Sequence, residues 1–189
     1  MVLAGSGVYL KRAAGLGMHG MSRGALIRAG GTAAVVGGIL RAAASFAPSF
    51  GSDSERQILY LVVDMFLLLG LLGFYELRYQ DVGRTGALGF LLALFGLVVV
   101  RSSGVVSGLD LYPVGAVAVA GGLIVLCGRA WSVKTLRVWV PTVFVVSTLV
   151  GLVGTVAGNS ARLLVASGVL FGAAVAGLGL EMRSAARRL

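Results

Sequence analysis

Charged side chains are scarce in this sequence. They make up 12% of its 189 residues, whereas apolar residues make up 58%. A soluble domain usually has about 25% charged residues. The charges fall almost entirely between long uncharged blocks, which is the pattern of repeated membrane spans. No stretch outside these blocks is long enough for a separate soluble domain, so the sequence predicts one membrane-embedded unit.

Cysteine and histidine each occur once. Cys127 has no partner for a disulfide, a redox pair or a thiolate cluster, and we interpret it as a small apolar residue within a helix. His19 lies before the first apolar block. A single histidine outside the spans excludes paired-imidazole haem ligation, a histidine metal cluster and a Ser-His dyad within the membrane. The cofactor stays unknown, and these absences argue against an enzyme.

The formal net charge is +9, but the basic residues flank the apolar blocks and do not form a continuous stripe. This distribution argues against nucleic acid as a partner. It is explained by orientation in the membrane and by attraction to anionic lipid headgroups. Membrane lipid is therefore the expected partner, and other membrane subunits or a second copy of the chain remain open.

Six apolar segments approach the length of about 20 residues that a membrane helix needs. We expect an all-α integral membrane protein, a bundle of about six transmembrane helices over residues 25–182. A Gly-rich basic tail (1–24) precedes it and a basic tail (183–189) follows, both cytoplasmic; Met18 and Met21 allow a natural start later than Met1. The expected spans are Ala25–Phe46, Gln57–Tyr75, Gly83–Arg101, Tyr112–Gly128, Val138–Val156 and Ala161–Met182.

The distribution of Lys and Arg predicts how this bundle is oriented. With the N-terminus inside, all but four of the 16 basic residues fall in inner segments. The exceptions are Arg56, Arg101 and Arg162 in outer loops and Arg41 within the first span. The asymmetry favours both termini in the cytoplasm and a location in the cytoplasmic (inner) membrane of a bacterium.

One acidic residue, Asp64, interrupts the apolar run "LVVDMFLLLG" of the second span. Arg41 of the first span is about as far from the intervening turn, so an antiparallel hairpin would bring both to the same depth. An unpaired charge there costs at least about 2.5–3.5 kcal/mol. We therefore predict an Arg41–Asp64 ion pair, with Arg101 as a competing partner. The pair would either fix the register of two helices or form a proton or cation site.

Small residues recur at four-residue spacing in the last span, at Gly168, Gly172 and Ala176. Such spacing favours close helix packing, within the chain by default or between copies. The segments "AAVVGGIL" (33–40) and "VAVAGGLI" (117–124) are also similar, as in the inverted repeats of many transporters. Among 30 glycines a shared Gly-Gly pair is expected by chance, so this similarity alone does not predict a repeat.

No catalytic or ligand-binding motif stands out. Asp64 and Glu76 lie about 18 Å apart along one helix, too far for a close carboxylate pair. The fifth span offers Ser147 and Thr148 instead of an acid, as a possible polar path. We expect a non-catalytic accessory or scaffold subunit of a membrane assembly. The alternative is a small transporter or channel-like protein that uses Asp64 as a proton or cation site.

Overall fold

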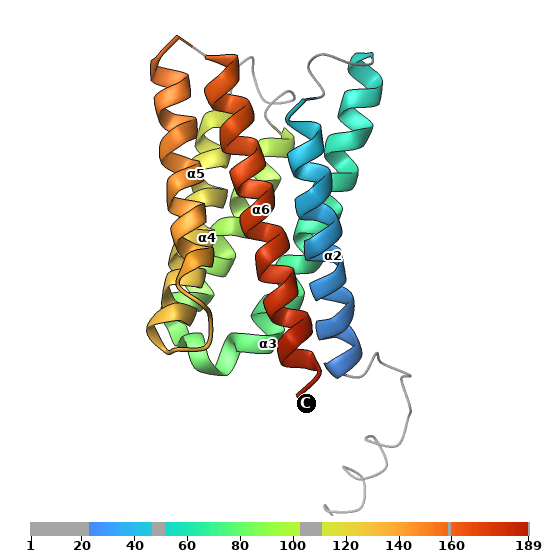
Figure 1. Ribbon diagram of the computed structural model, residues 1–189, viewed down its shortest axis with the longest axis vertical. Helices are drawn as coiled ribbons and strands as arrows, with labels where there is room; N and C mark the ends of the chain where they lie inside the picture. Colours follow the sequence, from blue (N-terminus) through green and yellow to red (C-terminus); the bar gives the residue numbers. More distant parts are fainter. Residues whose placement is uncertain (1–22, 47–51, 103–110, 159, 189) are drawn as a thin grey trace, which may run out of the picture.

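The computed structural model describes residues 23–46, 52–102, 111–158 and 160–188. These residues form an all-helical bundle without strands, in which the helices run along the long axis (Figure 1). His19, Met18, Met21 and most of the predicted N-terminal tail (1–24) lie outside them. The helices are α2 (Arg23–Ala44), α3 (Asp53–Ser102), α4 (Tyr112–Ser132), α5 (Trp139–Val156) and α6 (Ala161–Ala186). All five are long and apolar enough to cross a membrane.

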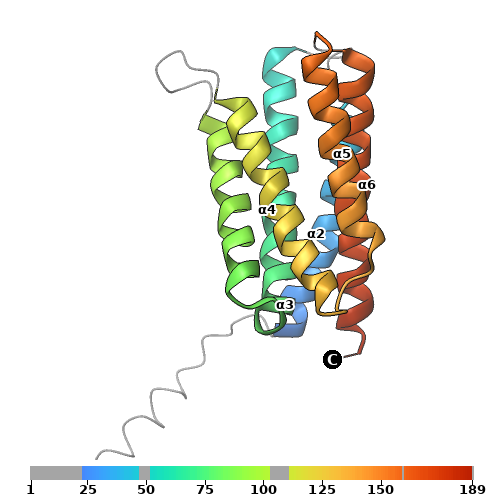
Figure 2. The same ribbon diagram turned by 90° about the vertical axis from the view of Figure 1, so that its left-hand side faces the viewer.

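The 50-residue helix α3 contains the second and third predicted spans. Gly83 interrupts it with a φ of 58° and a ψ of −156°, a conformation that favours glycine because it has no Cβ. The chain reverses direction there, so that a first arm (53–82) and a second arm (84–102) lie antiparallel (Figure 2). The residues between the two predicted spans (76–82) are therefore helical and end in a sharp turn. At the other end of the chain, α6 extends through Ala186 into the predicted tail 183–189.

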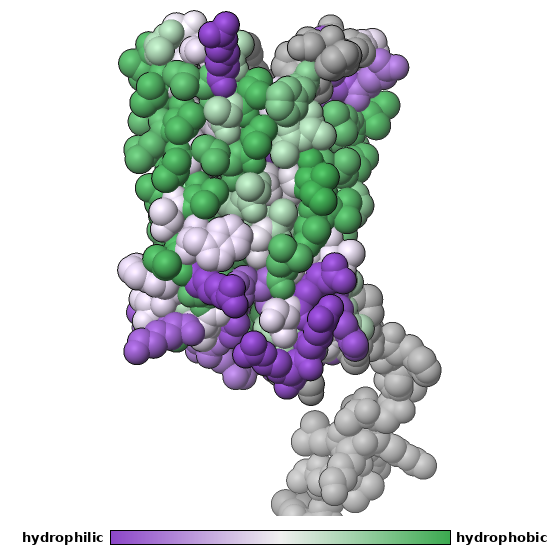
Figure 3. Space-filling view, viewed as in Figure 1, coloured by the Kyte–Doolittle hydropathy of each residue, from purple (hydrophilic) through white to green (hydrophobic). Residues whose placement is uncertain are grey.

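Helix α2 begins and α6 ends at the same end of the bundle (Figure 1). Hydrophilic residues cover that end on the face shown in Figure 3, and apolar residues cover most of the rest. We call it the basic end and the opposite one the far end. The basic side chains of the described residues at the basic end are Arg23, Arg28, Arg78, Arg84, Arg129, Lys134, Arg137, Arg183, Arg187 and Arg188.

Helix α2 packs closely against two neighbours through glycines on different faces. Toward the first arm of α3, a Cβ on Gly30 would lie 2.7 Å from the Cα of Gly73. Toward α6, a Cβ on Gly38 would collide with the carbonyl oxygen of Gly172 and lie 2.5 Å from the amide nitrogen of Ala176. Only residues without a side chain allow helix backbones to approach this closely.

The second arm of α3 packs against α4 in the same manner, an interface that the sequence analysis did not predict. A Cβ on Gly89 would lie 2.8 Å from the carbonyl oxygen of Gly122, and one on Gly115 would lie 2.7 Å from the amide nitrogen of Val100. Three pairs of helical segments are thus joined backbone to backbone.

Large apolar side chains both fill the bundle and surround it. Phe74, Phe144, Leu126 and Met182 are fully buried, and so is Cys127 in α4, in accord with its interpretation as a small apolar residue. Outward-facing residues of every helix are more than half exposed, among them Ile39, Leu88, Val117, Leu149 and Leu180. An apolar surface of this extent on all helices suits lipid rather than water as the surrounding medium.

The turn between α4 and α5 closes the basic end with a regular hydrogen-bonding pattern. The amide of Thr135 donates to the carbonyl of Ala130 (3.0 Å), and the amide of Lys134 donates to that of Trp131 (2.8 Å). These are the two bonds of a Schellman motif, whose left-handed position is usually glycine. Lys134 occupies it here, with a φ of 58°. Arg78 of α3 donates to the carbonyl of Thr135 (2.7 Å) and so joins the first arm of α3 to this turn.

Two adjacent glycines of α4 provide a matched test of the backbone contacts. We expect Gly122→Ala to lower the free energy of unfolding in detergent by about 1–3 kcal/mol, because the added methyl group would overlap the second arm of α3. Gly121 faces open space, so Gly121→Ala should be neutral or stabilising by up to about 1 kcal/mol, through helix propensity. Equal effects of the two substitutions would contradict this packing.

Candidate functional site

An ion pair joins the two arms of α3 near the far end of the bundle. Arg101 in the last turn of the second arm places its Nη2 2.8 Å from the Oδ2 of Asp64 on the first arm. At this distance the guanidinium donates a charge-assisted hydrogen bond to the carboxylate. The side chains of Arg101 and Asp64 are 36% and 23% exposed, so the pair can be reached from the surface of the bundle.

Asp64 forms its ion pair with Arg101, the competing partner named from the sequence, rather than with Arg41. Arg41 and Asp64 do lie at similar depth, since the hydroxyl of Tyr60 donates to the carbonyl of Ala44 (3.3 Å) across an antiparallel α2 and first arm. However, the Cζ of Arg41 lies 6.0 Å from the ring centroid of Tyr60, one helical turn before Asp64. The reversal at Gly83 brings Arg101 to the carboxylate instead. The choice between the two arginines therefore depended on the sharp turn at Gly83, which the sequence did not predict.

A surface hollow of about 350 Å³ opens beside the ion pair. Ser54, Gln57 and Arg101 supply its polar lining, and Ile58 and Leu61 supply its apolar lining. The described residues contain no group of three or more His, Cys, Asp or Glu side chains that could hold a metal ion. The chemistry available here is thus that of one carboxylate and a guanidinium, with a serine and an amide nearby.

Ser147 and Thr148, the possible polar path, both donate their hydroxyl hydrogen bonds to backbone carbonyls. The hydroxyl of Ser147 on α5 donates to the carbonyl of Ser167 on α6 (2.9 Å), and the hydroxyl of Ser167 donates back to the carbonyl of Ser147 (2.8 Å). Thr148 donates to the carbonyl of Phe144 one turn earlier (2.8 Å). Among the described residues, neither hydroxyl is bonded to the Asp64 pair. The two serines instead join α5 to α6.

The small residues Gly168, Gly172 and Ala176 lie on the face of α6 that contacts α2. A Cβ on Gly168 would collide with the hydroxyl oxygen of Ser45, and one on Gly172 would collide with the carbonyl oxygen of Gly38. This stripe is used within the chain, at the interface that holds the first and last described helices together.

Ion pairs also cross-link the basic end, and the sequence analysis did not predict them. Arg23 of α2 pairs with Glu76 of α3 (3.1 Å), and Arg137 before α5 pairs with Glu181 of α6 (3.2 Å). The partners are far apart in the sequence, so no local pattern reveals them. Exposed pairs such as these contribute little free energy individually.

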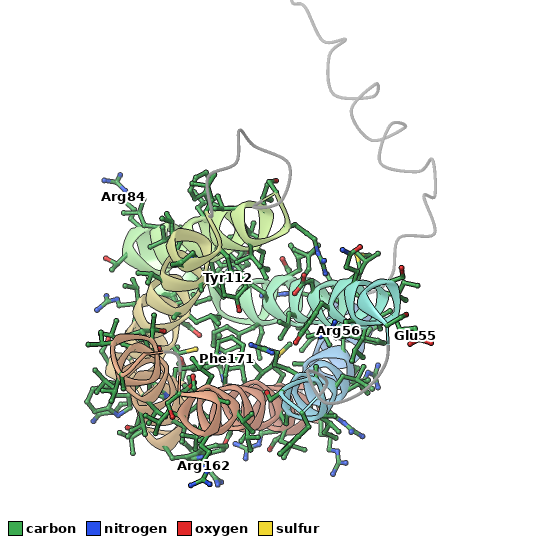
Figure 4. All side chains as sticks on the ribbon, turned by 90° about the horizontal axis from the view of Figure 1, so that it is seen from above. Glu55, Arg56, Arg84, Tyr112, Arg162 and Phe171 are labelled. Carbon is green, nitrogen blue, oxygen red and sulfur yellow. The ribbon has the colours of Figure 1, made fainter. Side chains whose placement is uncertain are left out.

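A small cavity of about 20 Å³ lies at the centre of the bundle, between α2, both arms of α3, α4 and α6. Its lining is apolar and includes Ala34, Leu71, Ala93, Leu123 and Phe171. Seen from the far end in Figure 4, Phe171 points into the middle of the bundle, whereas Arg84 and Arg162 point outward. The cavity has room for about one water molecule but offers it no polar side chain.

No family model, curated protein sequence or solved structure matches this chain. The function must therefore be inferred from the geometry of the bundle and its ion pair.

A double-mutant cycle tests which arginine holds Asp64. We expect Asp64→Asn to lower the free energy of unfolding in detergent by about 1.5–3 kcal/mol, the value of a hydrogen bond to a charged group. Its effect should shrink most in an Arg101→Gln background, since the hydrogen-bonded partner is already gone, and should change much less in an Arg41→Gln background, where only a longer-range attraction is lost. Coupling to Arg41 instead of Arg101 would contradict the pairing described above.

Proposed function

We propose that the protein crosses the cytoplasmic (inner) membrane of a bacterium six times, with both termini in the cytoplasm. The reversal of α3 at Gly83 supports six crossings, because each arm is then one pass through the bilayer. The gathering of basic residues at the end where α2 begins and α6 ends supports placing that end in the cytoplasm.

We further propose a non-catalytic role as an accessory or scaffold subunit of a membrane assembly. The observation that carries this proposal is the contrast between an apolar surface on every helix and an interior whose polar groups are satisfied. Among the described residues, the Nε of Arg78 is the one buried side-chain nitrogen or oxygen without a hydrogen-bond partner. A molecule of this kind offers lipid, another membrane subunit or a second copy a large surface for association, and offers a reaction few groups.

A second candidate function is that of a small transporter or channel-like protein with Asp64 as a proton or cation site. A charged pair within an apolar helix, next to a surface hollow, supports this alternative. The arginine already on the carboxylate weighs against it, because a cation would have to displace Arg101.

The proposed orientation predicts where single cysteines can be labelled. In a Cys127→Ala background, we expect Arg162→Cys at the far end to react with a membrane-impermeant maleimide in intact cells. Arg84→Cys at the basic end should react only after the cells are permeabilised. Both side chains point away from the bundle, so neither is shielded by it (Figure 4). The reverse labelling pattern would contradict the orientation.

The scaffold proposal predicts a constant partner and no ion movement. Purified from its own membranes in mild detergent, the tagged chain should retain the same membrane subunit, or a second copy, at a fixed ratio through successive steps. Proteoliposomes holding wild type or Asp64→Asn should show the same proton flux, because Asp64 then has only a structural role. A monomeric protein with proton flux that Asp64→Asn abolishes would reject the scaffold and support the transporter.

A further inference from the structure

The two glycine-rich interfaces, α2 with α6 and α4 with the second arm of α3, have the same residue pattern. In each, a Cβ added to one glycine would meet the carbonyl oxygen of another glycine and the amide nitrogen of the alanine four residues later. These sets are Gly38 with Gly172 and Ala176, and Gly122 with Gly89 and Ala93. In each, a second glycine would meet the carbonyl oxygen of a glycine and the amide nitrogen of the valine four residues later. These sets are Gly179 with Gly31 and Val35, and Gly96 with Gly115 and Val119.

Constant offsets in the sequence relate these contacts. Positions in α2 and α4 differ by 84 (31 to 115, 38 to 122), and positions in the second arm of α3 and in α6 differ by 83 (89 to 172, 96 to 179). Helix α2 runs away from the basic end and α4 runs toward it (Figures 1 and 2). The contacts therefore support an inverted repeat, which the similarity of two short segments could not do alone. Each interface joins a helix from one half of the chain to a helix from the other.

The remaining two helical segments, the first arm of α3 and α5, do not make equivalent contacts. A Cβ on Gly70 in the first arm of α3 would lie 2.8 Å from the Cβ of Ala34 on α2. On α5, a Cβ on Gly154 would lie 2.9 Å from the Cβ of Leu163 on α6, and Ser147 bonds Ser167 there. Both segments thus attach to the α2–α6 pair. We call α2, α5, α6 and the first arm of α3 the four-helix body, and α4 with the second arm of α3 the two-helix body.

Both described connections between these bodies lie at the basic end. One is Gly83, between the arms of α3, and the other is the turn between α4 and α5. Each contains a residue with a φ of 58°, Gly83 and Lys134. A Cβ on Gly83 would meet nothing within 4 Å, so its backbone is not enclosed by neighbouring atoms. The bond from Arg78 to the carbonyl of Thr135 holds the two connections together.

At the far end, the Asp64–Arg101 ion pair joins the bodies, with Asp64 on the four-helix body and Arg101 on the two-helix body. The central cavity lies between the two bodies. Residues such as Leu71 and Phe171 line it on the four-helix body, and Ala93 and Leu123 line it on the two-helix body. The α2–α6 interface and the interface between α4 and the second arm of α3 include direct backbone contacts. The interface between the bodies is instead formed by side chains, including the stacked rings of Tyr75 and Phe90, whose centroids are 4.2 Å apart.

We propose that the two-helix body swings away from the four-helix body about the connections at the basic end, and that the Asp64–Arg101 pair latches it closed at the far end. Opening connects the central cavity with the far side of the bundle. Rigid bodies that move about a few turn residues are the usual form of a hinged closure. This inference goes beyond the proposed function, because a scaffold subunit and a transporter could both contain such a hinge.

Distances between pairs of spin labels, measured by pulsed electron paramagnetic resonance in lipid nanodiscs, test the latch. In a Cys127→Ala background, cysteines replacing Val114 and Arg162 report the separation of the two bodies at the far end. A pair at Arg129 and Ser184 reports their separation at the basic end. A pair at Ile58 and Val156 lies within the four-helix body. All six positions are exposed, so the labels should be accommodated without disturbing the core.

We expect Asp64→Asn and Arg101→Gln each to lengthen and broaden the 114–162 distance and to leave the other two distances unchanged. Asp64→Glu, which keeps the carboxylate, and Arg41→Gln, which leaves the pair intact, should both retain the wild-type distance. An unchanged 114–162 distance in Asp64→Asn and Arg101→Gln would overturn the latch. A simultaneous change in all three distances would also overturn the proposal, since the pair would then stabilise the whole bundle rather than one hinge.

Discussion

Direct contact between helix backbones is the constraint on which this bundle depends. Within a bilayer, burying an apolar side chain between two helices gains little free energy, because the lipid that it leaves is equally apolar. Association then relies on close packing, and glycine allows the closest. Gly38 against Gly172, and Gly122 against Gly89, place peptide groups of neighbouring helices in contact. The order of the helices follows from these contacts, since α2 has two glycine faces and receives α6 on one and the first arm of α3 on the other.

Polar groups occupy the positions that this packing leaves to them. The hydroxyls of Ser147 and Ser167 exchange hydrogen bonds with each other's backbone, and Thr148 bonds its own helix. Asp64 and Arg101 neutralise one another near the far end, and at the basic end Glu76 pairs with Arg23 and Glu181 with Arg137. An unsatisfied polar group in hydrocarbon costs several kcal/mol. A polar side chain that faces another helix therefore requires a hydrogen-bonding or charged partner on that helix.

The sequence predicted the helical elements well and their partners less well. Apolar runs and prolines indicate spans from local composition, so five of the six expected starts lie within about two residues of a helix start or of the Gly83 break; the second span instead begins inside α3. Arg101 was named only as a competing partner of Asp64, because the choice between the two arginines depends on the sharp reversal at Gly83, and a single φ angle is not visible in an apolar pattern. The fit of α4 to the second arm of α3 was missed for a related reason. Gly89, Gly96, Gly115 and Gly122 have recognisable spacing only once the two helices are placed side by side.

The single-residue break at Gly83 also constrains how the chain enters a bilayer. The break leaves almost no free chain between the two arms of α3, so we expect them to enter a bilayer together as a hairpin, led by the ends that carry Asp64 and Arg101. Each charge alone would oppose passage into the hydrocarbon by about 2.5–3.5 kcal/mol at mid-membrane. Entering as a pair, they approach the lipid as one neutral dipole, so the interaction that joins the finished arms also lowers the barrier to their insertion.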